Sequence, residues 1–583
     1  MAPKSSTRVP LSVKGPIDCP YEGKEMLNLP QFNRGTGFTA EERELFNLAG
    51  HLPAALQTLQ NQVDRAYDQY SSISTPLGKN TFLMSLKVQN EVLYFRLLQD
   101  HLKEMFSIIY TPTESEAIEQ YSRLFRRPEG CFLDINHPEC IERSLAAGVR
   151  RRTLTTSLSV TARSVFRNAL MPVMQILGIG DQGVGAIGIS SAKTVLMTLC
   201  AGVHPSRCIP VALDVGTDNE RLLKDELYLG NRHNRVRGER YDKFVDDFVQ
   251  CVKKLYPRAV LHFEDFGLPN ARRLLETYRP QLACFNDDVQ GTGAVTLASL
   301  SSAVRVAGVD FRDLRTVIFG AGTAGTGIAD QLRDFLNTQG ISKQQVINHI
   351  WLVDKPGLLL ESMHDKLTPA QRPYAASDDH WKEIDTKSLA EIVKKVKPHA
   401  LIGCSTKPKA FNEAVLREMA KHVERPIVFP LSNPTRLHEA TPAEIFKYTD
   451  GKALVATGSP FGPVNNKEIA ENNNCFVYPG IGMGSILSRA DRVTETMIAA
   501  VVNELASLAP SENDPNGALL PDVADIRDIS AKIATAVVLQ ALEEGTARVE
   551  EIEGIKVPRD RDHCLAWVTE QMWKPEYRPL RKV

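Results

Sequence analysis

The chain has 583 residues, and its 69 Lys and Arg residues nearly balance 70 Asp and Glu, which gives a formal net charge of -1. At roughly 100–200 residues per domain, this length predicts two or three domains with a large core. The hydrophobic fraction of 43% and the charged fraction of 24% are typical of globular proteins and argue against wholesale disorder. Near-neutral charge removes the electrostatic attraction of a nucleic-acid binder, and no stretch approaches about 18 uninterrupted apolar residues. We therefore expect neither nucleic acid nor a membrane as a partner.

The cysteines and the N-terminus bear on the compartment. Ten cysteines are scattered and never form CxxC, so we expect neither a disulfide framework nor a zinc cluster. This usage indicates a reducing, intracellular compartment. The first 19 residues lack the continuous apolar run of a secretion signal. They are basic and contain serine, which is compatible with a mitochondrial presequence and equally with a frayed cytosolic terminus, so matrix and cytosol both stay open.

In chain order, the first predicted elements are helices. From about residue 40 to 130, segments such as LQNQVDRAYDQY place apolar residues three and four apart. Pro112 should break this helical region, leaving Tyr110 just before the break. From residue 176, a Gly-dense apolar run leads into a predicted helix, AKTVLMTLCAG. CIPVALDVGT and AVLHFEDFG are typical of short buried strands.

Beyond residue 300, predicted strands and helices alternate. The segments RTVIFG, HIWLVD, HALIGCS, RPIVFPLSNPT and KALVATG are each apolar and short enough to be strands. Alternation of this kind predicts a doubly wound parallel sheet.

The segment TVIFGAGTAGTGIAD contains a dinucleotide-binding pattern. Gly320, Gly322 and Gly325 form GxGxxG between a β-branched strand and a helix. The first glycine permits the tight turn, the second lets the backbone approach a pyrophosphate, and the third allows close packing of strand and helix. The phosphates would lie at the helix N-terminus, whose N–H groups favour negative charge. A purely structural glycine turn is the alternative, and the strand–turn–helix context favours dinucleotide binding.

Asp354 ends the next predicted strand and is placed to bind an adenosine ribose. It lies 34 residues beyond Gly320, more than the usual ~20, so we expect an additional loop near NTQGISKQQ. A carboxylate here repels a 2'-phosphate and favours NAD, whereas the adjacent Lys355 weakens that inference. NAD and NADP therefore both remain candidates.

Two acidic pairs follow short apolar strands. Glu264 and Asp265 are adjacent in HFEDFG, and Asp287 and Asp288 are adjacent in CFNDDVQGTG. Carboxylate oxygens suit Mg²⁺ or Mn²⁺. Either pair alone is as well explained by a solvated strand end or a helix N-cap. Two such pairs beside Gly-rich turns favour a metal site.

Further candidates are single polar or basic residues outside these motifs. Lys193 lies on a predicted helix among small and apolar residues, where burial would lower its pKa towards that of a general base, although most helical lysines are solvated. Tyr110 can donate a proton, although a tyrosine at a helix end is more often a packing residue. Asn433, Asn473 and Asn474 carry amides that can bind a polar substrate, yet each alone is typical of a turn.

Nine motifs together resemble the malic enzymes in order and spacing. They are YTPT, LGIGDQGVGAIGI, LDVGTDNE, FEDFG, FNDDVQGTG, FGAGTAGTGIAD, PLSNPT, ATGSPFGPV and NNNCFVYPGIG. The resemblance runs from about residue 80 to 540, and the C-terminal tail is similar to the fungal and bacterial branch. It implies an α/β fold in four parts: an N-terminal helical extension (1–80), a substrate and metal domain (81–290), a Rossmann-type NAD(P)-binding domain (291–545) and a tail (546–583).

The resemblance also implies an activity and a homo-oligomer. Malic enzymes oxidise L-malate at C2 with NAD or NADP, release CO₂ and protonate the remaining enol to pyruvate, in the presence of Mg²⁺ or Mn²⁺. They form dimers or tetramers.

Site roles follow from the same resemblance, position by position. Lys193 matches the general base for the C2 hydroxyl, Tyr110 matches the acid that protonates C3, and Asp287 matches the carboxylate that would hold the lysine. The matched metal ligands are Glu264, Asp265 and Asp288, and the matched substrate contacts are Asn433, Asn473 and Asn474.

One segment departs from the family. A VVxDG strand should precede ILGxGDxG, but residues 148–174 are basic, with no acidic residue between Glu142 and Asp181. Gln175 occupies a position where some members carry a substrate arginine, and we do not transfer that role. The segment is either a divergent surface insertion or sequence read out of frame or from a retained intron. Because Pro172 does not suit a central strand, we expect 148–172 to pack awkwardly and the sheet to resume near 174–177.

Two other functions stay open at this point. The unusual segment motivates a catalytically impaired protein that keeps the fold and binds dinucleotide or acts as a silent subunit. An unrelated Rossmann dehydrogenase, indifferent to metal, is disfavoured by the FEDFG and FNDDVQGTG motifs.

Overall fold

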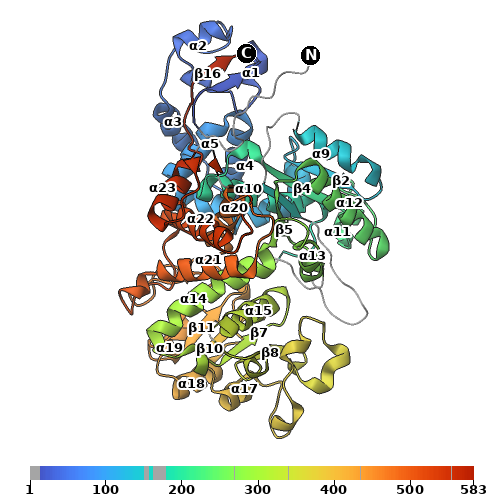
Figure 1. The fold of residues 1–583 in the computed structure, drawn as a ribbon, viewed down its shortest axis with the longest axis vertical. Helices are drawn as coiled ribbons and strands as arrows, with labels where there is room; N and C mark the ends of the chain where they lie inside the picture. Colours follow the sequence, from blue (N-terminus) through green and yellow to red (C-terminus); the bar gives the residue numbers. More distant parts are fainter. Residues whose placement is uncertain are drawn as a thin grey trace. The chain divides into compact units, whose positions relative to one another are not determined.

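The computed structural model describes residues 14–149, 157–161, 179–267, 270–338, 340–433, 435–549, 551–552 and 555–583. The chain divides into two compact units. Unit 1 comprises residues 1–161, 182–259 and 549–583, and unit 2 comprises 162–181 and 260–548. Each unit is described by itself below, with the elements labelled as in Figure 1.

The N-terminal part of unit 1 is helical, as the apolar spacing predicts. α3 starts with a capping box between Thr58 and Asn61. α6 ends at Ile109 and α7 begins at Thr113, which confirms the predicted break at Pro112. The helices are α1 (Gly23–Leu27), α2 (Ala40–Leu45), α3 (Leu59–Ser71), α4 (Pro76–Gln89), α5 (Glu91–Asp100), α6 (Leu102–Ile109), α7 (Thr113–Glu119) and α8 (Tyr121–Leu124).

The described ends of the chain meet within unit 1. β1 (Ile17–Cys19) pairs in parallel with β16 (Leu580–Lys582), which follows helix α23 (Arg561–Gln571). β14 (Glu551–Ile552) and β15 (Ile555–Lys556) form a short antiparallel pair.

Unit 1 contains three neighbouring parallel strands. β4 (Cys208–Asp214), where the sequence predicts a strand, lies between β2 (Cys131–Asp134) and β3 (Ser157–Thr161). The helices of this region are α9 (Ile141–Val149), α10 (Ile187–Ala201), α11 (Glu220–Lys224) and α12 (Glu239–Leu255).

β3 corrects the expected interruption at 157–161, whereas residues 150–156 and 162–172 of the same segment lie outside the described residues. Residues 157–161 pair with β4 in regular parallel register, from Ser157 opposite Cys208 to Thr161 opposite Ala212. The sequence SLSVT alternates polar and apolar residues and ends in two β-branched residues, which favours a strand. Pro172, Gln175 and the expected return of the sheet at 174–177 lie outside the described residues.

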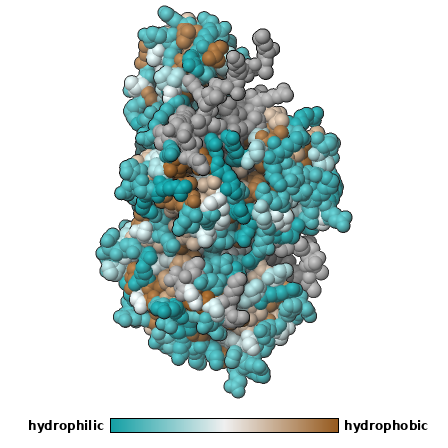
Figure 2. Space-filling view, viewed as in Figure 1, coloured by the Kyte–Doolittle hydropathy of each residue, from teal (hydrophilic) through white to brown (hydrophobic). Residues whose placement is uncertain are grey.

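The segment Gly183–Ala201, which includes α10, is more apolar than the search for uninterrupted apolar runs indicated. Among the described residues it is the one helical stretch long and apolar enough to cross a membrane, with a mean hydropathy of 1.5. However, 89% of it is buried inside the protein, which is typical of a core helix. The face drawn in Figure 2 carries mostly hydrophilic side chains, with hydrophobic ones in small, separate areas.

Unit 2 contains the predicted parallel sheet. Its strand order is β13-β12-β11-β10-β7-β8-β9, and every pair is parallel except β8 with β9. The strands are β7 (Thr316–Phe319), β8 (Ile350–Asp354), β9 (Gly357–Leu358), β10 (Ala400–Gly403), β11 (Ile427–Pro430), β12 (Leu454–Thr457) and β13 (Ala470–Glu471). β5 (Val260–Glu264) and β6 (Cys284–Asn286) pair in parallel and precede these strands in the chain.

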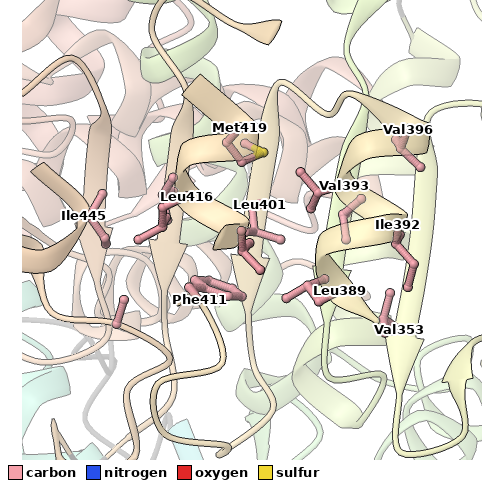
Figure 3. Close-up of a cluster of buried hydrophobic side chains, with 14 of the residues drawn as sticks. Val353, Leu389, Ile392, Val393, Val396, Leu401, Phe411, Leu416, Met419 and Ile445 are labelled. Carbon is pink, nitrogen blue, oxygen red and sulfur yellow. The ribbon is translucent and has the colours of Figure 1, made fainter. Parts of the chain in front are cut away.

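Helices cover both faces of the seven-stranded sheet, so the predicted doubly wound architecture is confirmed. α17, α18 and α19 pack their apolar residues on one face (Figure 3), and Figure 1 shows α14 and α15 on the other side of the strands. The helices of unit 2 are α13 (Asn270–Tyr278), α14 (Thr292–Ala307), α15 (Thr323–Thr338), α16 (Lys343–Val346), α17 (Leu389–Val396), α18 (Glu413–His422), α19 (Pro442–Tyr448), α20 (Tyr478–Leu487), α21 (Glu495–Ser507) and α22 (Ile526–Glu543).

The core between the sheet and α17 predicts a large loss of stability on truncation. Ile392 is fully buried in the cluster of Figure 3, so Ile392→Ala is expected to lower the free energy of unfolding by about 2–5 kcal/mol. The exposed Lys394, on the same helix, makes only a surface contact with Glu391, so Lys394→Ala should cost less than ~0.5 kcal/mol. Urea unfolding followed by circular dichroism measures both. Equal midpoints for the two variants would contradict the assignment of this core.

Candidate functional site

The strand order of unit 2 reverses at β7 and β10, whose carboxyl ends lie side by side. The chain continues from β7 to β8 on one side and then crosses to β10 on the other side. In open α/β sheets, ligands bind where the strand order reverses in this way. The glycine loop 320–325 follows β7 directly, so it lies at this position.

Two glycines of the loop have no room for a side chain. Gly320 has a φ of +111°, and a Cβ there would lie 2.4 Å from the carbonyl carbon of Cys404. A Cβ on Gly325 would lie 1.8 Å from the Gly320 carbonyl oxygen. The first glycine therefore lets the loop after β7 touch the loop after β10, and the second lets α15 begin close against the strand.

Asp354 lies at the carboxyl end of β8, beside β7 in the sheet. Its Oδ1 accepts a hydrogen bond of 2.8 Å from the Lys355 backbone N–H. The Nε2 of Gln371 is 3.5 Å from Asp354 Oδ2 and donates at 2.9 Å to the Ala321 carbonyl. Gln371 thus connects the carboxylate to the glycine loop. The expected insertion before this strand is not a plain loop, because it includes the short helix α16.

The two acidic pairs lie at the same end of β5 and β6. Glu264 and Asp265 end or follow β5, Asp287 and Asp288 follow β6, and the two strands pair in parallel. Asp288 Oδ2 accepts a hydrogen bond of 2.6 Å from the Asp265 backbone N–H. Glu264, Asp265 and Asp287 are all 0% exposed. The structure therefore brings together the four carboxylates that the sequence singled out.

His262 is a site residue that sequence reasoning missed. Its imidazole Nε2 lies 3.3 Å from Glu264 Oε2, and one ligand atom each from His262, Glu264 and Asp287 can be chosen within 4.8 Å of one another. The ring stacks on Phe285, with centroids 4.4 Å apart. The available signal was the spacing: His262 is two residues before Glu264 on one strand, so both side chains point to the same face.

The loop that carries Asp287 and Asp288 is held from both sides. It forms a π-helical turn, a feature often found at functional sites. Asn286 Oδ1 accepts the Val289 N–H at 3.0 Å, and Gln290 Oε1 accepts the Asn286 N–H at 3.1 Å. The Gln290 amide also donates to Glu495 at 3.2 Å, which anchors the turn to α21.

This donor set fits a divalent cation. Carboxylate oxygens at the ends of two strands, with one imidazole nearby, are ligands that Mg²⁺ and Mn²⁺ accept. Several buried carboxylates also repel one another strongly in a medium of low dielectric constant, and a cation between them relieves that repulsion. The chemistry of the cluster therefore suits a metal site.

In unit 1, the structure brings Lys193 and Tyr110 together. Lys193 is 2% exposed, on the buried helix α10, and its Nζ lies 5.6 Å from the centroid of the Tyr110 ring. Tyr110 is the residue that follows α6, with its N–H bonded to the Phe106 carbonyl at 3.0 Å. The helix break thus presents the phenol to the lysine. A buried amine beside a phenol can exchange protons with a bound substrate.

The three asparagines differ in their surroundings. Asn474 donates to Asp287 Oδ2 at 3.2 Å and to Thr292 Oγ1 at 3.0 Å, so it belongs to the acidic cluster. Asn433 donates to the Gly458 carbonyl at 2.8 Å and connects the loops after β11 and β12. Asn473 accepts the Cys475 N–H at 3.0 Å, as a turn residue does.

Glu114, close to Tyr110 in the chain, is a second residue that the sequence did not reveal. Its Oε2 accepts a hydrogen bond of 2.9 Å from the Asn80 amide, and its N–H donates to the Tyr110 carbonyl at 2.9 Å. Burial raises the pKa of the carboxyl to about 7. In the sequence, an acidic residue in the first turn of a helix is ordinary, so nothing marks it.

Family models match most of the chain. Residues 87–279 match the malic enzyme N-terminal domain, and residues 289–542 match the malic enzyme NAD-binding domain.

Full-length relatives agree with these matches. The mitochondrial NAD-dependent malic enzyme of Saccharomyces cerevisiae is 52% identical over 98% of this chain and 85% of its own length. The NAD-dependent malic enzyme of Schizosaccharomyces pombe is 44% identical over 98% of this chain and 100% of its own. The Entamoeba histolytica malic enzyme structure has a TM-score of 0.52 at 23% identity, covering 90% of this chain and 92% of its own, which shows a shared fold.

Glu114 predicts a pH-dependent stability. Its folded-state pKa of about 7 exceeds the ordinary carboxyl pKa of 4.5, so its contribution to stability is complete below pH 4.5 and is lost as the pH rises through about 7. Glu114→Gln keeps an acceptor for Asn80 without the charge. At pH 8 the variant should be more stable than the parent by on the order of 3 kcal/mol, and near pH 4.5 the difference should vanish.

The measurement is urea unfolding at pH 4.5, 6, 7 and 8. The exposed Glu116 on the same helix provides a control, and Glu116→Gln should change stability by less than ~0.5 kcal/mol. A Glu114→Gln variant that is less stable than the parent at pH 8 would show that the buried carboxylate is stabilised by its surroundings.

Proposed function

The chain belongs to the malic enzyme family, and we propose that it is an NAD-dependent malic enzyme, which converts L-malate and NAD⁺ to pyruvate, CO₂ and NADH. The observation that carries the proposal is the buried acidic cluster at the ends of β5 and β6, in the same unit as the glycine loop after β7. A dehydrogenase without a metal requirement has no use for such a cluster. The high identity to relatives named NAD-dependent malic enzymes, over nearly the whole chain, supports the same activity.

The acidic residues are the proposed metal ligands. Glu264, Asp265 and Asp288 would hold Mg²⁺ or Mn²⁺, with His262 orienting Glu264. When bound, a divalent cation polarises the C2 oxygen of malate and stabilises negative charge that develops there. The short bond from the Asp265 N–H fixes the Asp288 carboxylate, so that this ligand keeps its orientation before substrate arrives.

The glycine loop and Asp354 are the proposed cofactor contacts. Gly320, Gly322 and Gly325 would accept the pyrophosphate at the N-terminus of α15, and Asp354 would bind the adenosine ribose. A dinucleotide held by these residues would supply the acceptor for the hydride that leaves C2 of malate. We propose NAD rather than NADP, because the Asp354 carboxylate repels a 2'-phosphate and the relatives reported above are named for NAD.

The proton transfers are assigned to unit 1. Lys193 Nζ would accept the proton of the C2 hydroxyl as the C2–H bond is oxidised to a ketone. Loss of CO₂ then breaks the C3–C4 bond, and the phenol of Tyr110 would protonate C3 to give pyruvate. Burial of Lys193 keeps bulk water from supplying these protons. Asp287 is assigned to hold the lysine on the family pattern alone.

The remaining assignments have weaker support. Asn433, Asn473 and Asn474 are proposed substrate contacts, of which Asn474 has the most direct support because it bonds to Asp287.

We propose a homodimer or tetramer on the family resemblance. The name of the S. cerevisiae relative supports a mitochondrial location over a cytosolic one. The four domain ranges given above remain a proposal. No observation favours an impaired enzyme, since 157–161 form a regular strand.

Purified protein should reduce NAD⁺ only when L-malate and Mn²⁺ or Mg²⁺ are both present, and should produce pyruvate in equal amount. Lys193→Ala and Asp288→Ala should each lower kcat by about 10²–10⁴-fold, because they remove the base and a metal ligand. Lys224, exposed on α11, provides the control, and Lys224→Ala should retain parental activity. Absorbance at 340 nm measures all of these. Normal turnover by Lys193→Ala would remove the base assignment, and no malate-dependent reduction by the folded, metal-loaded parent would remove the proposed activity.

A separate variant tests the cofactor preference. Asp354→Ala removes the carboxylate that would bind the ribose, so we expect the KM for NAD to rise by roughly tenfold, as for loss of one charged hydrogen bond, with little change in kcat. The KM for NADP should fall, because repulsion of the 2'-phosphate is removed. A variant that keeps the parental preference for NAD over NADP would assign that preference to other residues.

A further inference from the structure

Glu439 is a fully buried carboxylate whose side chain bonds to the loops that follow β10 and β11 in unit 2. It is 0% exposed, and neither the acidic pairs nor the glycine motif includes it. We propose that Glu439 is a positioning residue for dinucleotide binding: its Oε1 atom fixes the loops that follow β10 and β11. This inference rests on the proposed function, since it concerns the same cofactor.

One carboxylate oxygen accepts three hydrogen bonds. Glu439 Oε1 accepts from the backbone N–H of Ser405 at 2.9 Å, from the Ser405 hydroxyl at 2.8 Å and from the Ser432 hydroxyl. Ser405 follows β10 and Ser432 follows β11. A single side chain therefore bridges the carboxyl ends of two adjacent strands.

Each serine also secures its surroundings. Ser432 Oγ accepts the Thr406 N–H at 2.8 Å, which adds a second connection between the two loops. Ser405 Oγ accepts the Lys407 N–H at 3.1 Å and so closes its own turn. With both hydroxyl protons directed to Glu439, the network is directional, and the carboxylate is the common acceptor on which it depends.

The loop that carries Ser405 lies against the glycine loop after β7. The Cys404 N–H bonds to the Phe319 carbonyl at 2.7 Å, and the Gly320 Cα closely approaches the backbone of Cys404 and Ser405. A displaced Ser405 would therefore displace, or lose contact with, the first glycine of the dinucleotide loop. On the other side, Ser432 directly precedes Asn433, a proposed substrate contact.

The backbone at Gly403 leaves room for the Glu439 carboxylate only because Gly403 has no side chain. A Cβ on Gly403 would lie 2.5 Å from Glu439 Cδ, so the last residue of β10 must be glycine for Glu439 to reach the two serines. The Glu439 backbone is itself fixed, because its carbonyl accepts the Phe411 N–H at 3.0 Å. Three donors satisfy the Oε1 atom and so reduce the cost of burying this carboxylate, and these donors lie on the elements that a bound dinucleotide would touch.

The test measures NADH binding separately from metal binding on the full-length protein. Glu439→Ala removes the acceptor, whereas Glu439→Gln keeps an oxygen at that position. Glu444→Ala provides the matched control, because Glu444 lies five residues later and only caps α19 with Thr441. NADH affinity is measured by fluorescence titration and Mn²⁺ affinity by electron paramagnetic resonance.

We expect Glu439→Ala to raise the Kd for NADH at least tenfold and Glu439→Gln to raise it less than threefold. Glu444→Ala should leave it unchanged, and all three variants should bind Mn²⁺ like the parent. In the assay, the KM for NAD should rise with Glu439→Ala more than kcat falls. If Glu439→Ala does not fold, the double variant Ser405→Ala with Ser432→Ala removes the same bonds and should show the same increase.

Two failures are distinguishable. Suppose that the parent binds NADH with a measurable Kd and that folded Glu439→Ala, or the double serine variant, binds it with the same Kd. This result would overturn the role of Glu439 and leave the proposed function intact. A parent protein that binds no NADH at all would instead overturn the proposed function. An equal loss of NADH and Mn²⁺ affinity in Glu439→Ala would show a general structural defect and would also overturn the positioning role.

Discussion

The constraint on which the structure of the site depends is the burial of carboxylates at the ends of β5 and β6. Glu264, Asp265 and Asp287 are inaccessible to water. Neighbouring negative charges repel one another strongly in a medium of low dielectric constant. Folding tolerates this arrangement only when hydrogen bonds or cations compensate it. The surrounding structure holds these carboxylates with hydrogen bonds and a fixed backbone. Asp265 adopts a positive φ of 61°, which is strained for a residue with a side chain and turns its N–H towards Asp288. The π-helical turn after β6 and the anchor from Gln290 to Glu495 keep the second pair in place.

The glycine loop of unit 2, which we propose as the cofactor site, depends on close backbone contact rather than on charge. The loop after β7 can touch the loop after β10 only because Gly320 has no side chain, and α15 can start against the strand only because Gly325 has none. Such contacts help a ligand to bind only if the loop after β10 keeps its position. The hydrogen bonds from Ser405 and Ser432 to Glu439 fix that loop.

Sequence patterns were sufficient for local structure and for residues whose chemistry is local. The strands at 208–214, 260–264 and 316–319, the break before Pro112 and the doubly wound sheet all follow from apolar spacing and from glycine and proline positions. The pairing of the two acidic motifs also follows, because the carboxyl ends of parallel strands meet at one edge. The segment 157–161 was misjudged because its arginine-rich surroundings obscured a short alternating pattern.

The residues that sequence reasoning did not find all act through distant partners. Gln371 reaches the glycine loop across 50 positions, Glu439 bonds to Ser405 across 34, and His262 is significant only because β6 places Asp287 beside it. In the sequence, each is one polar residue among many. Their roles appear only when the sheet brings the loops together.

The most direct test of this account is the stoichiometry of Mn²⁺ binding to the full-length protein, measured by electron paramagnetic resonance in the absence of substrate. The account predicts one tightly bound Mn²⁺ per chain in the parent protein. It also predicts loss of that ion in a Glu264→Gln, Asp288→Asn double variant whose circular dichroism spectrum is unchanged. If the double variant bound Mn²⁺ as tightly as the parent, the buried carboxylates at the ends of β5 and β6 would not be the metal site, and the central claim would be wrong.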